Sequence, residues 1–400
     1  MPTFNPHDPA FLQDPYPAYT VLRAAGPAFF DEDSGLWCFL NHADVDALLR
    51  DRRLGRAISP ALMPESERPI DPPEHEPFTR LNRHSMFDME PPEHTRLRSL
   101  VHQAFTPRRV ENLRAAVGAL CSELLDAAAA MGGMDVIEDF AVPLPVAVIA
   151  ELLGVPRGEY ANLRRWSEAI VAMYELDPTP ETARQAVAAA QEFSDFLRRL
   201  AALRRKDPQD DLFSALALLN EEGHTLSEDE LVATCVLLLN AGHEATVNVI
   251  GNGLWALLRH PEQMAALRND PTLLPGAVEE LLRWDTPLQL FRRWVLQDMD
   301  IHGIRLRPGD RVGLLLGAAN RDPAVFARPD AIDIRRGASP HLAFGAGIHY
   351  CLGAPLARLE LNLAFAALLG RFSGLRLAGP GPQYRPKYVI RGLHSLHVSF

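Results

Sequence analysis

One cysteine stands in a stretch whose residues could hold a metal ion. Cys351 is preceded by Phe344, Gly345 and Gly347 and followed by Gly353, and an apolar helical pattern begins directly after it. Glycine permits a positive φ and lets the backbone pass close to a bulky group. A helix that begins beside a thiolate offers unpaired N–H groups and the positive end of its dipole, which favour the anionic sulfur. These residues suit a thiolate ligand for a metal, although an isolated cysteine is more often a small core residue.

A second candidate site interrupts a long apolar helix. The pattern predicts this helix from Leu226 to Arg259, with Ser227 and the acidic residues after it as the start signal. Gly242 and Glu244 stand in the middle of the segment. A glycine there costs about 1 kcal/mol relative to alanine, and a buried glutamate costs more unless it is paired or solvated. Their combination indicates a functional site, and the alternative for Glu244 is a buried ion pair or a charge on the helix surface.

The run Phe344-x-x-Gly347-x-x-x-Cys351-x-Gly353 resembles the haem-ligand signature of the cytochrome P450 family. This signature is long and specific, and further matches follow the order of the family over nearly the whole chain. The resemblance implies a bound haem b (iron protoporphyrin IX) whose iron is held by the Cys351 thiolate, and electron donation from this ligand favours O–O cleavage. It also places Phe344, Gly345 and Gly353 against the haem.

The same resemblance implies a fold. We expect a single cytochrome P450 domain over residues 1–400, mainly α with minor β, in which the haem lies between the long helix and the cysteine loop. The expected parts are an α-rich body at about 94–290 and 340–372 and small β-containing parts at about 26–40, 290–316 and 383–400.

In this family the long helix passes over the haem. The resemblance implies that Ala241 and Gly242 let the helix approach the oxygen site and that Glu244 is the acid that relays protons to dioxygen. The next position is normally threonine, but it is Ala245 here, and Thr246 follows about 100° further around the helix. Three interpretations are open: Thr246 substitutes through a local helix distortion, a water molecule or substrate hydroxyl completes the relay, or oxygen activation leaks peroxide or relies on added peroxide.

Two haem carboxylates are buried anions that need cationic or hydrogen-bonding partners, and arginine suits them because its donors form a fork. The resemblance assigns this role to His94, Arg98, Arg293 and His349. His94 and Arg98 are four residues apart and share one helix face. Arg292 stands beside Arg293, and strand alternation puts the two side chains on opposite faces, so only one can point at the haem. Any one of these residues taken alone would more often be a surface charge.

Glu280 and Arg283 match the Glu-x-x-Arg pattern of the same family. The pattern is weak by itself, because Glu181 and Arg184 also fit it. The position of Glu280 and Arg283 between the long helix and the cysteine loop favours them. We expect a structural role, in which both join a buried charge network with the segment 320–335 and support the cysteine loop.

Length and composition are those of a globular protein. The 400 residues are 47% hydrophobic and 23% charged, which is ample for a large core. Four widely spaced cysteines without a Cys-x-x-Cys pair indicate neither a disulfide framework nor a zinc site, and reduced thiols suit the cytoplasm. No signal peptide is expected, and no apolar stretch is long enough to span a membrane. The net charge of −11 argues against a nucleic-acid partner.

Most of the remaining chain has helical patterns. After an extended, proline-punctuated arm over residues 1–13, we expect helices over 14–25, 41–49, 94–105, 108–131, 137–149, 151–153, 159–173, 182–205, 261–269 and 274–283. Strands are expected over 28–30, 36–40, 292–295, 301–304, 310–315 and 389–400. The proline-rich stretch 59–92 is long for a connection and is interpreted as a cover of the substrate pocket, with a simple linker as the alternative.

We expect a haem-thiolate monooxygenase that inserts one atom of dioxygen into a hydrophobic small organic substrate. The chain has no flavin or ferredoxin segment, so an external ferredoxin and ferredoxin reductase would supply electrons to a monomeric enzyme. A basic dock on the cysteine side could include Arg108, Arg109, Arg336 and Arg358, with solvated surface charge as the equal alternative. Ala245 motivates a second hypothesis, a peroxide-driven oxygenase, and a third is a non-enzymatic haem-based ligand sensor or carrier.

The substrate pocket is expected to be mainly apolar. Its lining residues are expected from 60–90, from roughly 165–195, and from 236–241, 288–291 and 389–390. This composition predicts a hydrophobic organic molecule of medium size and does not choose its chemical class.

Overall fold

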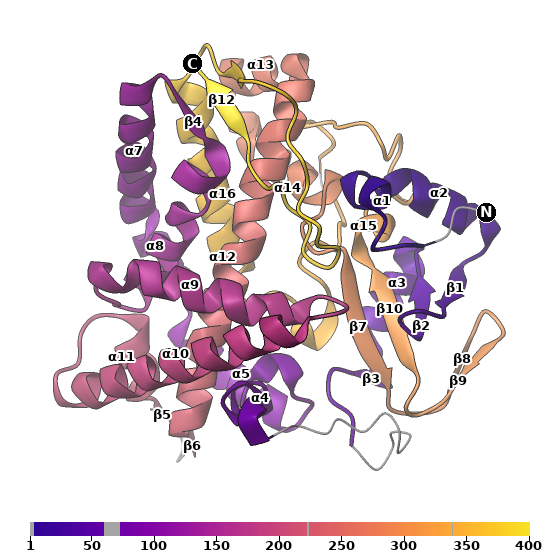
Figure 1. Cartoon of the computed structure of the whole chain (residues 1–400), viewed down its shortest axis with the longest axis vertical. Helices are drawn as coiled ribbons and strands as arrows, with labels where there is room; N and C mark the ends of the chain where they lie inside the picture. The colour runs from indigo at the N-terminus through magenta and orange to yellow at the C-terminus, as the bar shows by residue number, and fades with distance from the viewer. Residues whose placement is uncertain (1–3, 60–72, 222–223, 338) are drawn as a thin grey trace. The chain divides into compact units, whose positions relative to one another are not determined.

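The computed structural model describes residues 4–59, 73–221, 224–337 and 339–400, and 58% of it is helical (Figure 1). The expected fold class, mainly α with minor β, is confirmed. The chain divides into two compact units, each described by itself below. The described parts of Met1–Ile58, Val117–Leu144 and Glu244–Phe400 form the first unit, and those of Ser59–Ala116 and Pro145–His243 form the second. The assignment of residues 1–400 to one domain stays a prediction.

The second unit is built from helices whose start signals are visible in the sequence. It contains α4 (Glu76–Arg83), α5 (Glu93–Ala104), α6 (Pro107–Asn112), α9 (Tyr160–Val171), α10 (Pro180–Lys206), α11 (Leu212–Ala217) and nearly all of α8 (Pro143–Leu152). Thr106, Thr179 and Asp211 each accept a hydrogen bond from a backbone N–H in the first turn of α6, α10 or α11. Trp166 of α9 stacks on Phe193 of α10 with ring centroids 5.1 Å apart, and this contact holds the two helices side by side.

The first unit contains the helices that surround the second half of a long helix, α12 (Glu228–Arg259), which enters this unit at Glu244. The others are α1 (Pro9–Gln13), α2 (Tyr16–Ala25), α3 (His42–Arg50), most of α7 (Arg114–Met131), α13 (Pro261–Asn269), α14 (Leu274–Trp284), α15 (Leu316–Ala319) and α16 (Ala354–Arg371). A Cβ at Gly253 of α12 would lie 2.8 Å from Phe365 of α16 and 3.0 Å from Leu281 of α14. The three helices therefore approach each other closely at a glycine.

The main sheet of the first unit positions a buried arginine. Its five strands lie in the order β1 (Ala28–Asp31), β2 (Leu36–Phe39), β10 (Arg311–Leu315), β7 (Leu290–Val295) and β3 (Leu54–Gly55). Strand β10 runs parallel to β2 and antiparallel to β7, and it places Val312 opposite Arg293 (Figure 1). Phe39, Val45 and Leu314 belong to the buried apolar cluster between this sheet and α3. Burial of this cluster fixes the strand that carries Arg293.

Shorter strands complete the described part of the chain. They are β4 (Gly133–Asp135), β11 (Arg376–Leu377) and β12 (His397–Ser399) in one sheet, the hairpin β8 (Met299–Ile301) and β9 (Ile304–Leu306), and the hairpin β5 (Asn220–Glu221) and β6 (His224–Thr225). Among the helices of the described residues, none combines the length and the hydropathy of a membrane span.

Some helix boundaries differ from the sequence prediction for local reasons. The arm over residues 1–13 is not wholly extended, because the Asp8 side chain caps α1. The predicted helix 108–131 is broken at Leu113 into α6 and α7. The helix predicted from residue 137 begins as a π-helix, Ile137–Ala141, and Pro143 lacks the N–H that would continue this pattern.

Two other segments differ as well. In place of the strand predicted over 389–400, β12 covers only His397–Ser399. The Val389 carbonyl accepts a hydrogen bond from Gln289, and the Arg391 N–H donates to Pro287, so this stretch is held as a loop. Of the proline-rich stretch 59–92, residues 60–72 lie outside the described residues.

Candidate functional site

The loop before α16 carries Cys351 in a tightly turned backbone. The Cys351 N–H donates to the Phe344 carbonyl at 2.9 Å, which closes the loop on itself. Gly345 and Gly347 have φ values of 66° and 69°, and a Cβ at Gly347 would lie 2.5 Å from the Leu49 carbonyl oxygen. Such positions exclude larger residues. The Cys351 sulfur lies 3.9 Å from the position that a Cβ would take at Gly353, and Gly353 directly precedes the first residue of α16. The sulfur is therefore close to a helix N-terminus, where a thiolate is favoured.

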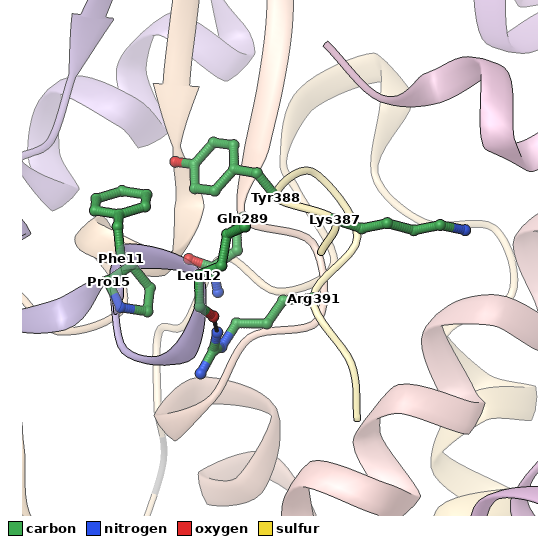
Figure 2. Close-up of a pocket in the computed structure, with 7 residues that line it drawn as sticks. All are labelled: Phe11, Leu12, Pro15, Gln289, Lys387, Tyr388 and Arg391. Atoms are coloured by element: carbon green, nitrogen blue, oxygen red, sulfur yellow. Dashed lines mark hydrogen bonds between the residues drawn. The ribbon is translucent and has the colours of Figure 1, made fainter. Parts of the chain in front are cut away.

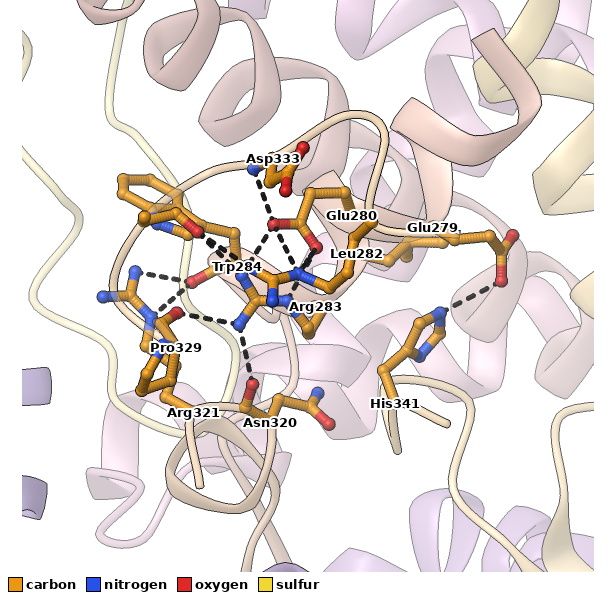
Figure 3. A network of polar contacts seen from close by, with 12 residues as sticks. Glu279, Glu280, Leu282, Arg283, Trp284, Asn320, Arg321, Pro329, Asp333 and His341 are labelled. Carbon is orange, nitrogen blue, oxygen red and sulfur yellow. Dashed lines mark hydrogen bonds and ion pairs between the residues drawn. The ribbon is translucent and has the colours of Figure 1, made fainter. Parts of the chain in front are cut away.

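An arginine–carboxylate pair ties this loop to two helices. Glu279 of α14 accepts hydrogen bonds from Nε and Nη2 of Arg358 of α16 at 2.7 and 2.8 Å, and it lies 3.1 Å from Nε2 of His341 (Figure 3). The Arg358 guanidinium lies over the Phe344 ring at 4.5 Å and donates to the Tyr350 hydroxyl at 3.4 Å. Burial by itself raises the pKa of Glu279, but the hydrogen bonds from Arg358 and His341 outweigh burial and lower this pKa to about 2.

Glu280 and Arg283 form a second, deeper network. Their side chains are 1% and 0% exposed, and they are joined by two hydrogen bonds of 2.8 and 2.7 Å (Figure 3). Nη1 of Arg283 also donates to the carbonyls of Asn320 and Pro329, each at 2.9 Å. Glu280 accepts from the backbone N–H of Asp333 at 2.8 Å. The network therefore fixes the backbone after α15 against α14.

This network reaches the cysteine loop through one amide side chain. Oδ1 of Asn320 accepts the Leu342 N–H at 2.7 Å, and the Leu342 carbonyl accepts the Gly345 N–H at 2.8 Å. A chain of three hydrogen bonds, through Asn320 and Leu342, thus connects Arg283 to Gly345 in the glycine turn of the loop. The structure brings Glu280, Arg283 and the loop into one connected arrangement.

Arg293 is the buried member of the Arg292–Arg293 pair, with 4% of its surface exposed, whereas Arg292 is half-buried. Its guanidinium lies over the Phe291 ring at 5.3 Å. The same ring lies 3.4 Å from the Cβ position of Gly345. Phe291 therefore links the strand that carries Arg293 to the loop that carries the cysteine.

The middle of α12 combines a buried acid with uncovered small residues. Glu244 is 7% exposed, and its Oε2 lies 3.9 Å from Nη1 of Arg385. Thr246 is buried, Ala241 is exposed and Ala245 is partly exposed. Ala241 and Ala245 are four residues apart and share one helix face. The helix runs from Glu228 to Arg259, and the role of Thr246 stays a prediction.

Arg385 was not singled out from the sequence, and its own anchoring explains its position. Its backbone N–H donates to Gly392 at 2.9 Å, and its Nε donates to the Leu393 carbonyl at 3.0 Å. These bonds hold the guanidinium beside Glu244 of the same unit. No local pattern in the sequence indicates this pairing, because 141 residues separate the two positions.

The second unit holds the other predicted haem contacts. His94 lies in the first turn of α5 and is buried, and Arg98 lies one turn further along and is half-buried. Burial lowers the pKa of His94, and the charge of Arg98 lowers it further, so the imidazole is neutral near pH 7. A Cβ at Gly242 would lie 2.7 Å from Cδ1 of Ile149, which accounts for the glycine in α12 as a close contact with α8.

The residue types present fit a haem. Cys351 is the cysteine with a partly exposed sulfur-bearing side chain, and the three other cysteines are buried. A flat, apolar cofactor with two carboxylates needs an accessible thiolate, buried cations and small residues that leave room for the ring. The chain supplies these as Cys351, Arg293 and the face of α12 with Ala241 and Ala245. His349 lies in a short 3₁₀ turn two residues before the cysteine.

Each unit contains a small pocket. In the second unit, a cavity is lined by Leu81, Asn82, Ser85, Ile170, Tyr174, Ala233, Val236, Leu237 and Asn240. It unites three of the segments that were predicted to line the substrate pocket, apart from residues 60–72. The other two predicted segments meet in the first unit, where Leu288 pairs with Ile390.

In the small pocket of the first unit, the Arg391 side chain binds groups of the N-terminal helices. Figure 2 shows Arg391 reaching the Leu12 carbonyl, to which its Nη1 donates. Its Nε also donates to Asp285 at 2.8 Å, and Asp285 accepts from the hydroxyl groups of Tyr16 and Tyr384. Burial alone would raise the pKa of Asp285, but Arg391 and the tyrosine hydroxyls lower it below its usual range. The pocket therefore fastens the C-terminal loop to the N-terminal helices.

The arginines considered for a basic dock differ in their availability. Arg358 pairs with Glu279, and Nε of Arg336 lies 3.0 Å from Glu280 with 13% of its side chain exposed. Both serve the framework of the first unit. Arg109 lies 4.0 Å from Asp210, which is fully exposed, and Arg108 is exposed.

Comparison with known proteins gives a consistent result. The family model described as Cytochrome P450 matches residues 60–387. The chain is 43% identical to "Cytochrome P450 monooxygenase PikC" of Streptomyces venezuelae, over 97% of this chain and 91% of that protein. It is 38% identical to "Polyketide biosynthesis cytochrome P450 PksS" of Bacillus subtilis, over 99% of this chain and 98% of that protein. The solved structure of P450BioI in complex with acyl carrier protein ligated to hexadec-9Z-enoic acid superposes with a TM-score of 0.91, at 37% identity, over 98% of this chain and 99% of that chain.

Loss of the buried Glu280–Arg283 pair should destabilise the protein much more than loss of an exposed pair with the same sequence spacing. Arg283→Met leaves Glu280 buried with fewer partners and should lower the free energy of unfolding by about 3–5 kcal/mol. Arg184→Met removes the exposed Glu181–Arg184 pair, also at spacing i, i+3, and should cost at most about 1 kcal/mol. Urea unfolding measures both values. Equal losses in the two variants would contradict the network as described.

The Glu279 carboxylate predicts a defined pH dependence. Because its pKa falls from 4.5 to about 2 on folding, the ion pair stabilises the protein above about pH 4.5, and this contribution is lost as the pH falls towards 2. Glu279→Gln should lower the free energy of unfolding at pH 7 by about 1–2 kcal/mol, after allowance for solvent screening at this half-buried site. The difference from the parent protein should shrink between pH 5 and pH 3 in urea unfolding.

The exposed Glu262 of α13 gives the control, since Glu262→Gln should change stability little at either pH. A deficit of Glu279→Gln that stays constant down to pH 3 would rule out the ion pair as its source.

Proposed function

The chain belongs to the cytochrome P450 family, whose members bind haem b and act as monooxygenases, and we propose that it oxidises a hydrophobic small organic molecule with electrons from an external ferredoxin and ferredoxin reductase. The observation that carries this proposal is the Cys351 loop. It presents a partly exposed cysteine beside the N-terminus of α16 within the complete haem-ligand signature. We place the enzyme in the cytoplasm as a monomer.

In this proposal, the Cys351 thiolate would hold the haem iron, and the framework residues keep the cysteine loop in place. Bound haem supplies the activation of dioxygen that a protein side chain cannot perform. The glycine turn and the backbone hydrogen bond from Cys351 to Phe344 define the path of the loop, and the Arg358 guanidinium lies over the Phe344 ring. The positive end of α16 holds the sulfur as a thiolate. Gly353 leaves the space beside the sulfur free of a side chain.

Four side chains are proposed to bind the haem carboxylates: His94, Arg98, Arg293 and His349. Arg293 is supported by its burial, since a buried guanidinium needs anionic or hydrogen-bonding partners. Its Nη1 donates to the Arg292 carbonyl at 3.0 Å, which fixes the direction of the guanidinium. His94 is neutral near pH 7 and would contribute a hydrogen bond instead of a charge.

Glu244 is proposed to move protons on the oxygen side. Arg385 holds its carboxylate within the first unit, so the acid is oriented without the hydroxyl that normally follows it. Ala245 cannot donate a proton, and Thr246 is buried on another side of the continuous helix. We therefore propose that ordered water or a substrate hydroxyl connects Glu244 to the reacting oxygen.

A peroxide-driven oxygenase is the second candidate, because Ala245 removes the usual hydroxyl. The two candidates share the cofactor and the substrate pocket and differ in the source of oxidising equivalents. Product formation with hydrogen peroxide, and none with a ferredoxin system, would favour the second. Lack of oxidation with either source would favour a haem-based sensor or carrier.

The haem-thiolate proposal predicts the spectrum of the reduced protein with carbon monoxide. The parent protein should show the long-wavelength band of a thiolate-ligated haem, and Cys351→Ser should lose this band together with substrate oxidation, because the oxygen ligand donates less electron density. Cys121→Ala is the control, since Cys121 is buried and burial raises its pKa to about 12. A Cys351→Ser protein that keeps the band would contradict the proposal.

The Glu244–Arg385 pair predicts a defect in proton supply. Glu244→Gln should lower product formation by about 100-fold or more, as loss of a proton-transferring group does. Arg385→Gln should lower the yield of product per electron consumed and raise the yield of peroxide, because the carboxylate is no longer held. Lys387→Gln, a change of a nearby cation in the same loop, should leave both yields unchanged. Product and peroxide yields equal to those of the parent in both variants would remove Glu244 from the relay.

A further inference from the structure

The carboxamide of Asn240 is buried in α12 without a hydrogen-bonding partner. The residue is 3% exposed, and within the described parts of the chain neither Nδ2 nor Oδ1 has a partner. Buried polar atoms are nearly always paired, and each exception requires an explanation. A carboxamide can donate two hydrogen bonds and accept two, so Asn240 has its full capacity unused.

Asn240 lines the cavity of the second unit. Three apolar residues of α12 that line the same cavity, Ala233, Val236 and Leu237, precede Asn240 by seven, four and three residues, which puts all four on one helix face. The enclosed space is about 10 Å³, about the size needed for one water molecule, and the wider space of about 250 Å³ between the lining side chains includes open solvent. The unpaired amide therefore borders a small space that continues into open solvent.

Ser85 uses its polar groups in hydrogen bonds near its own position in the chain, and the cavity lining is uncharged. The Ser85 hydroxyl accepts the Phe87 N–H at 3.2 Å, and the Ser85 N–H donates to the Asn82 carbonyl at 3.1 Å. None of the nine described residues that line the cavity carries a charge. A carboxylate ligand would lose its hydration here without gaining a cation, whereas a neutral carbonyl or hydroxyl needs only hydrogen bonds.

We propose that Asn240 recognises a neutral oxygen atom, a carbonyl or a hydroxyl, on an otherwise hydrophobic substrate. The inference rests on the proposed function, because it takes this cavity to be part of the substrate pocket. A polar group on the protein that is left unpaired by a hydrocarbon disfavours that ligand, so the amide selects oxygenated molecules over hydrocarbons of the same shape. Asn240 is thus a specificity-determining residue within a mainly apolar pocket.

The test uses the haem-loaded full chain and three probes with one ring: cyclododecanone, cyclododecanol and cyclododecane. Binding is followed by the change in the haem absorption spectrum, which gives a Kd for each probe. The parent protein should bind at least one oxygenated probe about 10-fold or more tightly than cyclododecane, a ratio that one good hydrogen bond supplies. Asn240→Leu should abolish this ratio. The Kd of the oxygenated probe should rise, and the Kd of cyclododecane should stay the same or fall.

Controls separate recognition from structure. Leu237→Val changes the shape of the cavity without changing its polarity and should shift the three Kd values by similar factors. The melting temperature of Asn240→Leu should equal or exceed that of the parent, because an unpaired buried amide is removed. Asn240→Val provides a second apolar variant if the leucine protein does not fold.

The outcomes are distinct. A parent protein that binds no oxygenated probe, or binds all three equally, overturns the inference, and so does a preference that survives in both apolar variants. The carbon monoxide spectrum of the same preparations tests the proposed function separately. If the spectrum shows a thiolate-ligated haem and both apolar Asn240 variants still prefer oxygenated probes over cyclododecane, only the role of Asn240 is contradicted. If the parent protein lacks that spectrum, the proposed function is contradicted.

Discussion

Burial of one guanidinium group constrains the arrangement of the first unit. Arg283 is fully removed from water, and its rigid set of donors must meet acceptors in defined directions. Glu280 and the carbonyls of Asn320 and Pro329 provide these acceptors. Other paths for the backbone after α15 would leave donors unpaired in a low-dielectric interior, which is costly. The side chain of Asn320 is fixed as a result and positions the start of the cysteine loop through Leu342.

The cysteine loop of the first unit and the middle of α12 differ in their surroundings. Arg358 ties the cysteine loop to α14 and α16. On α12, Ala241 is exposed, Ala245 is partly exposed, and within the described residues the amide of Asn240 is unpaired. A loop that holds a ligand benefits from a fixed geometry, whereas a face that binds a ligand must leave interactions available.

The parts of the structure that could be predicted from the sequence have local signals. The cysteine motif, the long helix and the acidic start of that helix are contiguous in the sequence. The helices predicted over 182–205 and 226–259 have boundaries within two residues of α10 and α12. The pairings of Glu244 with Arg385 and of Glu279 with Arg358 join segments far apart in sequence. Charges of this kind have no periodicity, which is why Arg358 was considered for a partner dock. The segment 389–396 resembles a strand in composition, but its backbone hydrogen bonds go to several separate segments, residues 287–289, 383–385 and 135–136, so it forms a loop.

The anchoring of Arg391 connects the ends of the polypeptide to its chemistry. The C-terminal loop that carries Arg385 is tied through Arg391 and Tyr384 to Leu12 and Gln13. Changes to the first turns of the chain, such as an appended purification tag or a trimmed N-terminus, would act on the same loop that carries Arg385, whose Nη1 lies 3.9 Å from Oε2 of Glu244. The position of a fusion tag can therefore affect the activity that is measured. Proteins tagged at the N-terminus and at the C-terminus should be compared.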